Sequence, residues 1–158
     1  MKNIDLTLTY QDLSFDELAP REQELVTLAR VASQRAYAPY SKFQVGAAIL
    51  LSNGEIVTGS NQENAAFPSG TCAERTAAFW AHSQYPKAKF KAIAVAAFNT
   101  SGREIEEPVA PCGACRQVLL EFEKLAGDNV KVLLVGHTKI YVIDSVKALL
   151  PFAFCEFE

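Results

Sequence analysis

The chain has 158 residues, of which 49% are hydrophobic and 21% charged, and its formal net charge at pH 7 is −3. This length and composition are typical of one globular domain and exclude a disordered or low-complexity chain. The acidic balance argues against nucleic acid as a partner, because binding to a phosphate backbone requires clustered Lys and Arg.

The four cysteines are the first candidates for a functional site: Cys72, Cys112, Cys115 and Cys155. The N-terminal sequence has no continuous apolar region of the kind found in secretion signals, and no stretch approaches the roughly 18 apolar residues of a membrane span. We therefore expect a cytoplasmic protein with no membrane partner. In a reducing cytosol, cysteines at short spacing are more often metal ligands or catalytic groups than disulfides.

The first 20 residues have the character of an N-terminal extension, and residues 21–158 that of a single domain. Within the extension, residues 4–10 alternate between apolar and polar side chains, as a strand does. Pro20 then marks a boundary. An apolar stripe on one side predicts a helix over residues 21–36.

Helical and strand patterns alternate along the rest of the chain. Further helices are predicted from Thr71, from Cys112, and from a cap at Asp144 or Ser145. Asn53-Gly54 is a strong signal for a hairpin turn between two strands. The predicted strands are residues 45–51, 56–58, 91–98, 130–135 and 140–143. This alternation predicts an α/β domain with three layers, in which helices cover both faces of a mixed five-stranded sheet.

Pro111-Cys112-Gly113-Ala114-Cys115 places two cysteines three residues apart at the start of a predicted helix. Residues three apart are neighbours on a helix surface, so both sulfurs can face one metal ion. The partial positive charge of a helix N-terminus also favours the thiolate. Taken alone, the motif has a competing and less favoured interpretation as a redox dithiol of the thioredoxin kind.

Cys72 supplies a third sulfur, also near a predicted helix start, and Glu74 follows two residues later. Three protein ligands leave one position of a tetrahedral zinc ion open for water, whose pKa the metal lowers. A nearby carboxylate can then shuttle a proton to a leaving group. Glu74 has a second interpretation, as the partner of Thr71 in a capping box at the helix start. The two roles conflict, and the residues alone leave them open.

The combination of Cys72-Ala73-Glu74 with Pro111-Cys112-Gly113-Ala114-Cys115 resembles the known signature of zinc-dependent cytidine deaminases, of the small, homotetrameric, three-cysteine type. The resemblance extends over roughly residues 24 to 154 and includes residues 37–43 and 61–65. It implies a cytidine deaminase-like fold with one Zn²⁺ per subunit bound by Cys72, Cys112 and Cys115. It also implies that Glu74 is the catalytic proton shuttle.

The resemblance implies several further roles near the metal. Asn61 and Glu63 match the pair that holds the ribose hydroxyls, and Arg75 matches an arginine that donates to the zinc thiolates. The residues expected to bind substrate are Phe43, Asn61, Glu63, Ala65, Phe67, Ala73 and Phe154, with Ala65, Phe67 and Phe154 reaching across subunit boundaries. On the residues alone, Phe43 and Phe154 are also consistent with core aromatics, Asn61 with a turn former and Arg75 with a solvated charge.

The implied function is hydrolytic deamination of free cytidine and 2′-deoxycytidine in pyrimidine salvage. One alternative keeps the chemistry but takes an analogue such as blasticidin S or a polynucleotide. Another is a non-enzymatic zinc module in which Cys155 is the fourth ligand and no position stays open. The sequence departs from the family pattern at Phe67, where tyrosine is common, and at Ser69 and Thr71, where apolar residues are common. These departures bear on the substrate range.

Overall fold

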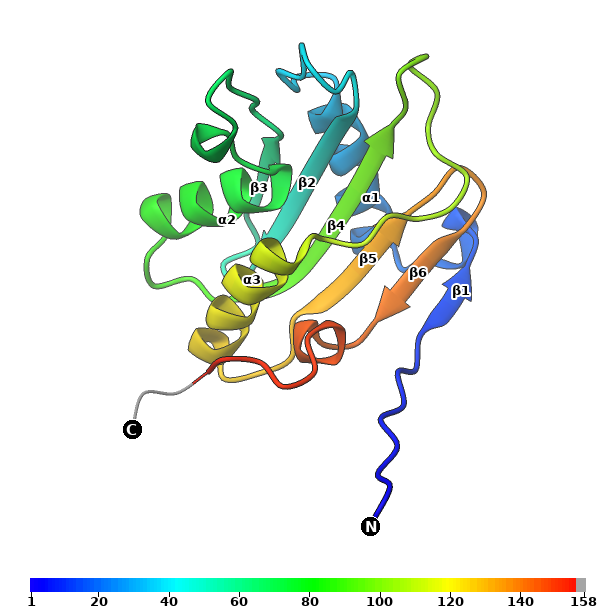
Figure 1. Cartoon of the computed structure of the whole chain (residues 1–158), viewed down its shortest axis with the longest axis vertical. Coiled ribbons are helices and arrows are strands. Elements are labelled where there is room, and N and C mark those ends of the chain that lie inside the picture. Colours follow the sequence, from blue (N-terminus) through cyan, green and yellow to red (C-terminus); the bar gives the residue numbers. More distant parts are fainter. Residues whose placement is uncertain (156–158) are drawn as a thin grey trace.

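A mixed sheet of six strands forms the centre of the computed structural model, which describes residues 1–155 (Figure 1). The strand order is β1-β6-β5-β4-β2-β3. The strands are β1 (Gln11–Leu13), β2 (Gln44–Leu51), β3 (Ile56–Ser60), β4 (Phe90–Phe98), β5 (Lys131–Val135) and β6 (Ile140–Ile143). Only β4 and β5 pair in parallel. A parallel pair requires a crossover connection, and α3 (Gly113–Ala126) supplies it.

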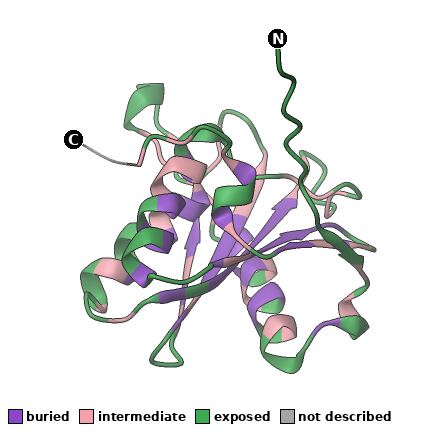
Figure 2. Cartoon of the chain, turned by 90° about the horizontal axis from the view of Figure 1, so that it is seen from below, coloured by how far each residue is buried: buried purple, intermediate pink, exposed green. Residues whose placement is uncertain are grey.

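Helices cover both faces of this sheet, as the sequence predicts (Figures 1 and 2). On one face, α1 (Pro20–Ser33) packs Leu25, Val26 and Ala29 against buried residues of β2, β4, β5 and β6. On the other face, α2 (Ala73–Gln84) and α3 pack onto a second apolar cluster that includes Ile49 and Ile93. The predicted three-layer α/β architecture is therefore confirmed.

Two glycines allow the helices to lie close to the sheet. A Cβ atom at Gly46 in β2 would come within 2.1 Å of the Ala29 carbonyl oxygen of α1. A Cβ atom at Gly59 in β3 would come within 2.5 Å of the Ala77 backbone nitrogen of α2. Backbone atoms cannot yield to such contacts, so these positions fix the distance of α1 and α2 from the two faces.

The sheet has one strand more than predicted. The extra strand is β1, which pairs antiparallel with β6 in a register that places Gln11 opposite Val142 and Leu13 opposite Ile140. The sequence pattern located a strand at residues 4–10, but those residues have no neighbouring strand within the described part of the chain. Alternation shows that a segment can pair, and the position of the partner decides where it does.

Helix ends also differ from the sequence prediction. The first helix stops at Ser33, and residues 34–36 continue as single turns. The predicted last helix is a 3₁₀ turn, η3 (Val146–Leu149), in which the Ser145 hydroxyl accepts a hydrogen bond from the Lys147 backbone nitrogen. Two further 3₁₀ turns are η1 (Phe15–Glu17) and η2 (Phe67–Ser69). None of the helices described over residues 1–155 has the length and apolarity that crossing a membrane requires.

Candidate functional site

Three cysteines from the N-termini of two helices converge. Cys72 immediately precedes α2, Cys112 immediately precedes α3, and Cys115 lies in the first turn of α3. The Sγ atoms of Cys72 and Cys112 are 3.9 Å apart, and those of Cys112 and Cys115 are 3.6 Å apart. All three sulfurs lie within 4.8 Å of one another. A disulfide needs about 2.05 Å between sulfurs, so these are free thiols arranged around a common point.

The spacing of the sulfurs fits a tetrahedral zinc ion. With Zn–S bonds of about 2.3 Å, the sulfurs of a tetrahedron lie about 3.8 Å apart. Cys155 lies outside this cluster, and its thiol donates a hydrogen bond to the Ala153 carbonyl oxygen at 3.3 Å. Among the described residues, this group could therefore supply three thiolate ligands, which would leave the fourth position of a tetrahedral ion for water. This donor set is that of a catalytic site rather than a closed structural one.

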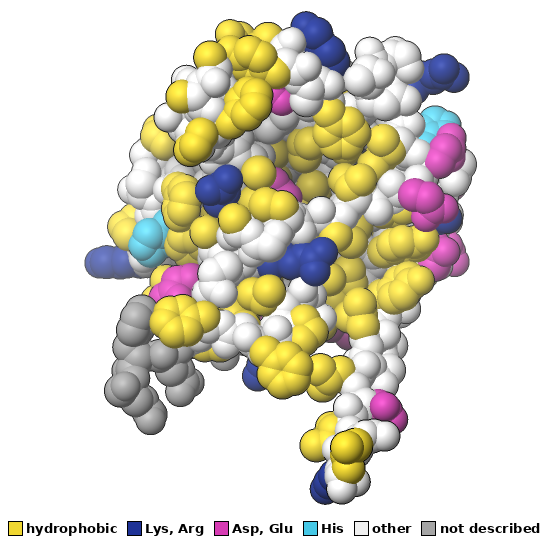
Figure 3. Space-filling model, viewed as in Figure 1, with side chains coloured by type: hydrophobic (Ala, Val, Ile, Leu, Met, Phe, Trp, Pro, Cys, Tyr) yellow, Lys and Arg dark blue, Asp and Glu magenta, His cyan; other side chains and the backbone are white. Residues whose placement is uncertain are grey.

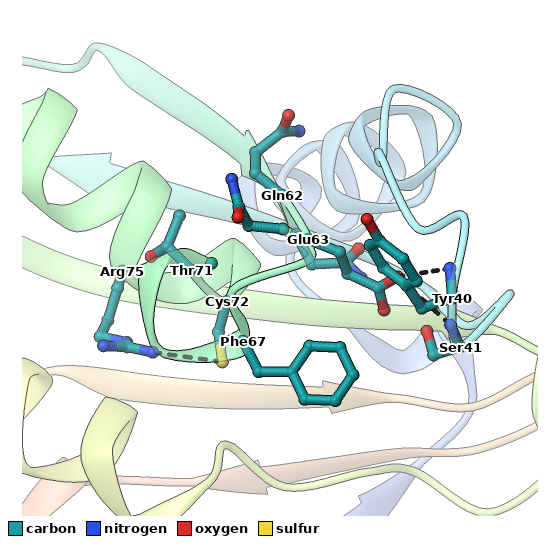
Figure 4. Close-up of a pocket in the computed structure, with 11 residues that line it drawn as sticks. Tyr40, Ser41, Gln62, Glu63, Phe67, Thr71, Cys72 and Arg75 are labelled. Atoms are coloured by element: carbon teal, nitrogen blue, oxygen red, sulfur yellow. Dashed lines mark hydrogen bonds between the residues drawn. The ribbon is translucent and has the colours of Figure 1, made fainter.

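The charges at the cysteine cluster are unevenly divided. Hydrogen bonding from the Cys115 thiol, aided by Arg75 and Cys112, lowers the pKa of Cys72 to about 5. The same interaction with Cys72, together with burial, raises the pKa of Cys115. An Nη atom of Arg75 lies 3.7 Å from Cys72 Sγ (Figure 4). Without a cation the cluster therefore favours one thiolate at Cys72 and a protonated Cys115, and a bound divalent cation would stabilise the second thiolate.

Glu74 is a buried carboxyl group beside these thiols. It lies in the first turn of α2 and is only 5% exposed. Burial and, to a smaller extent, the charge of Cys72 raise the pKa of Glu74, while a hydrogen bond from its own backbone nitrogen and a contact with Cys115 act in the opposite direction. An acid whose pKa is moved towards neutrality is suited to accept and return a proton.

The predicted capping box of Thr71 and Glu74 is wrong. The helix begins at Ala73, its N-cap residue is Cys72, and no side chain caps it. The backbone of Thr71 instead pairs with Gln62, through a nitrogen-to-oxygen hydrogen bond of 2.9 Å in each direction. Glu74 is therefore not the partner of a Thr71 cap, and its carboxyl group lies beside the thiols instead.

A cavity of about 560 Å³ opens beside Cys72 (Figure 4). This volume is in the range of small-molecule binding sites. Five of the sequence-predicted site residues line it: Asn61, Glu63, Phe67, Cys72 and Arg75. They come from the loop after β3, from η2 and from the start of α2.

Asn61 and Glu63 are held in place by backbone groups. The Asn61 side chain accepts a hydrogen bond from the Val45 backbone nitrogen at 2.8 Å and donates one to the Phe43 carbonyl oxygen at 2.9 Å. Glu63 accepts hydrogen bonds from the backbone nitrogens of Tyr40 at 2.9 Å and Ser41 at 3.2 Å (Figure 4). The Ser41 side chain is the largest of several hydrogen-bond donors that lower the pKa of Glu63. Glu63 is therefore an ionised acceptor with a fixed position.

Seven sequence-predicted site residues do not line this cavity: Phe43, Ala65, Ala73, Glu74, Cys112, Cys115 and Phe154. Phe43 is half-buried just before β2, Ala65 is exposed in the loop after β3, and Ala73 is buried at the start of α2. Phe154 is exposed in the C-terminal segment, where its carbonyl oxygen accepts a hydrogen bond from the Gln117 side chain at 2.7 Å. One chain alone thus brings together only part of the predicted set.

The cavity also has lining residues that the sequence did not single out as site residues: Tyr40, Ser41, Gln62, Asn64, Gly70 and Thr71. Tyr40 and Ser41 contribute backbone nitrogens, and the Gln62–Thr71 pairing is made by backbone groups. Backbone roles of this kind do not depend on the identity of the side chain, although the Ser41 side chain also lowers the pKa of Glu63. The sequence signal that could have pointed to Tyr40 and Ser41 is the loop after Pro39, because that loop is part of the family resemblance.

Comparison with known proteins places the chain among deaminases. The sequence profile described as the cytidine and deoxycytidylate deaminase zinc-binding region matches residues 20–127. The chain is 43% identical over 132 residues to the cytidine deaminase of Sporosarcina psychrophila, which covers 84% of this chain and 90% of that protein. It is equally similar to the cytidine deaminase of Halalkalibacterium halodurans, over 84% of this chain and 92% of that protein.

Solved structures give the same result. The cytidine deaminase of Burkholderia pseudomallei superimposes with a TM-score of 0.71 at 39% identity, covering 83% of this chain and 97% of that chain. The cytidine deaminase of Mycobacterium tuberculosis superimposes with a TM-score of 0.64 at 34% identity, covering 85% of this chain and 98% of that chain. The similarity extends over nearly the full length of both relatives.

Proposed function

Because this chain belongs to the cytidine and deoxycytidylate deaminase family, we propose that it deaminates free cytidine and 2′-deoxycytidine by zinc-dependent hydrolysis. The products are uridine or 2′-deoxyuridine and ammonia. This reaction is a step of pyrimidine salvage. The observation that carries this proposal is the convergence of three cysteine sulfurs within 4.8 Å, beside the buried carboxyl group of Glu74.

The chain's own residues divide the work of the reaction. Cys72, Cys112 and Cys115 would hold one Zn²⁺ per subunit, and the bound ion would supply a Lewis acid that lowers the pKa of water. Glu74 accepts a proton from the attacking water and delivers protons to the pyrimidine ring and to the departing amino group. Arg75 donates to the Cys72 thiolate and offsets part of the negative charge of three sulfurs.

We propose a nucleoside rather than a nucleotide as the substrate. Asn61 and Glu63 form the sugar end of the cavity, where an amide and a carboxylate can donate to and accept from ribose hydroxyls. Glu63 is ionised and would repel a phosphate group placed near it. Arg75 is the one cationic side chain among the described residues that line the cavity, and it is already directed at Cys72.

We propose that the active unit is a homotetramer in the cytoplasm, with sites completed between subunits. Phe67 and Phe154 are 75% and 63% exposed in the single chain, although both positions match substrate-binding residues of the family. Ala65 is exposed in the same way, and a neighbouring subunit would cover all three. A reducing compartment would keep the cysteine ligands as thiols. An active preparation that scatters light as a monomer would contradict the proposed assembly.

The decisive experiment compares turnover of cytidine, 2′-deoxycytidine, dCMP and blasticidin S by the fall in ultraviolet absorbance. We expect the two nucleosides to have the highest kcat/KM. Faster turnover of dCMP than of cytidine would refute the nucleoside assignment, and exclusive turnover of blasticidin S would favour the analogue deaminases. Cys155→Ser is the control for the four-cysteine alternative, and we expect it to keep both zinc and activity.

A further inference from the structure

The N-terminal arm, defined here as residues 2–12, is unlike the rest of the surface. It projects from the body of the molecule as an extended segment with apolar side chains open to solvent (Figures 1 and 3). Ile4, Leu6 and Leu8 are 77%, 67% and 47% exposed, and every odd-numbered residue from 3 to 11 is polar. Soluble proteins rarely leave such a row of apolar side chains uncovered.

The arm runs directly into an edge of the sheet. Its last two residues, Gln11 and Asp12, belong to β1, whose one side pairs with β6 and whose other side is the free edge of the described sheet. At the base of the arm, the Tyr10 ring packs on the Tyr141 ring of β6 with 4.8 Å between centroids. The register of β1 and β6 therefore places the even-numbered arm residues on the same face of the sheet as Tyr141.

The arm lies outside the part of the chain that the family shares. The family profile begins at residue 20. The relative from Burkholderia pseudomallei is covered over 97% of its length, although it covers only 83% of this chain. The family profile therefore does not account for these residues, and their exposed apolar face needs a separate explanation.

We propose that the arms of two copies of this chain pair as antiparallel strands about a two-fold axis at Thr7. In this register the residue numbers of each opposing pair add up to 14. Leu6 then faces Leu8, and Thr7 faces Thr7 of the second copy. The remaining pairs are Lys2 with Asp12, Asn3 with Gln11, Ile4 with Tyr10, and Asp5 with Thr9. The free edge of β1 gains a neighbour, and the sheets of the two copies become continuous.

The sequence of the arm selects this register and this partner. Here the apolar pairs share one face, and the opposite charges of Lys2 and Asp12 meet at both ends of it. A shift by two residues would place Lys2 opposite Tyr10 or Asp12 opposite Ile4. A shift by one residue would place apolar side chains opposite polar ones, and parallel pairing would place Lys2 opposite Lys2. The arm is therefore complementary to itself in both charge and apolarity. For this reason we assign the partner strand to a second copy of the chain.

A cysteine cross-link tests the geometry directly. Opposing Cβ atoms in an antiparallel pair are about 4.5–5.5 Å apart, so Thr7→Cys should link to itself under a mild oxidant. Trypsin releases residues 3–21, which contain no native cysteine, so mass spectrometry can identify the linked peptide without interference from the zinc ligands. Asn3→Cys is the matched control, because its two copies would lie about 26 Å apart at about 3.3 Å per residue.

The expected result is a linked peptide from Thr7→Cys and none from Asn3→Cys. Equal linking at both positions would indicate parallel or random contact and would overturn the proposal. An unlinked Thr7→Cys would also overturn it, and binding of that protein to phosphatidylcholine–phosphatidylglycerol vesicles would then identify a lipid surface as the occupant. In the Thr7→Cys background, adding Leu6→Ser with Leu8→Ser should reduce the linked fraction several-fold, whereas Asp5→Ser with Thr9→Ser should leave it nearly unchanged.

Discussion

The cysteine cluster with Glu74, here called the cysteine end of the site, and the proposed sugar end of the cavity satisfy their polar groups in opposite ways. At the cysteine end, ionisable groups are buried against one another, and the pKa values of Cys115 and Glu74 are both raised. At the sugar end, each polar side chain already has backbone partners: Asn61 bonds to Val45 and Phe43, and Glu63 bonds to Tyr40 and Ser41.

This difference shows which end depends on its ligand. Three sulfurs and a carboxyl group at short range cannot all be negative without a cation, so the cysteine end is completed only when a metal binds. The sugar end has its geometry before any substrate arrives, and such preorganisation reduces the cost of binding. We therefore expect perturbations of the cysteine end to abolish chemistry, and perturbations of the sugar end to change affinity and stability.

Removal of zinc should have the largest effect. A strong chelator should abolish deamination completely, and added zinc should restore it. Because the pKa of Cys115 is raised in the metal-free cluster, zinc binding should release at least one proton near neutral pH. Calorimetry in buffers of different ionisation enthalpy measures that proton. Zinc binding without proton release would show that the thiols are already ionised. The cysteine end would then not depend on a metal to ionise its groups, and the contrast with the sugar end would fail.

Glu74→Gln should be the next most severe change. It removes the proton shuttle but keeps the size of the side chain, and general acid–base catalysis typically contributes about 10²–10⁴-fold to a rate. We expect kcat to fall by about that factor while the zinc content stays that of the parent protein. A variant that retains zinc and deaminates at the parental rate would refute the proposed mechanism.

Glu123→Gln is a matched control, because Glu123 is a second buried glutamate at 7% exposure. Its carboxylate accepts hydrogen bonds from the backbone nitrogens of Val130 and Val146 at 2.9 and 2.7 Å, and from the Ser145 hydroxyl at 2.8 Å. A glutamine amide at this position would place its own N–H donor against these backbone N–H and serine O–H donors. Its substitution should therefore lower the melting temperature and leave kcat near the parental value.

Asn61→Ala should have a moderate effect, mainly on stability. It leaves the Val45 nitrogen and the Phe43 oxygen without their side-chain partner, and each loss of this kind costs about 1–3 kcal/mol when the group is buried. Urea unfolding should show the loss, and KM for cytidine should rise. The control is Asn53→Ala, since the exposed Asn53 side chain bonds to the Glu55 nitrogen at 3.1 Å and water can replace it. Equal destabilisation by both variants would contradict a prebuilt sugar end.

Much of the fold and the metal ligands could be predicted from local sequence signals. The apolar stripe of α1 and the apolar runs of β2, β4 and β5 show which side chains are buried. The burial pattern in turn predicts that helices pack on both faces of the sheet. The cysteine spacing placed Cys112 and Cys115 on one side of a helix start. Cys72 needed the family resemblance, because only the tertiary fold brings residues 40 positions apart to 3.9 Å.

The remaining features depend on partners that the sequence does not reveal. The strand at Gln11–Leu13 exists because β6 lies beside it, and the α2 cap moved to Cys72 because Thr71 pairs with Gln62. Tyr40 holds Glu63 through its backbone nitrogen, a role for which no side-chain pattern exists. Phe154 does not line the cavity of a single chain, so its proposed role depends on the proposed second subunit.

The smallest expected effect is a shift in the acid limb of substrate binding. Hydrogen bonds led by the Ser41 side chain lower the pKa of Glu63 from its ordinary value of 4.5, so the native site favours the ionised form. The contribution of Glu63 to binding is therefore fully present above pH 4.5 and is lost only as the pH falls through the lowered pKa. KM for cytidine, measured with zinc content checked at each pH, should stay flat down to that limit. Ser41→Ala should move the rise in KM to higher pH, and a rise that begins near pH 6 in the parent protein would show that Glu63 is not held by its donors.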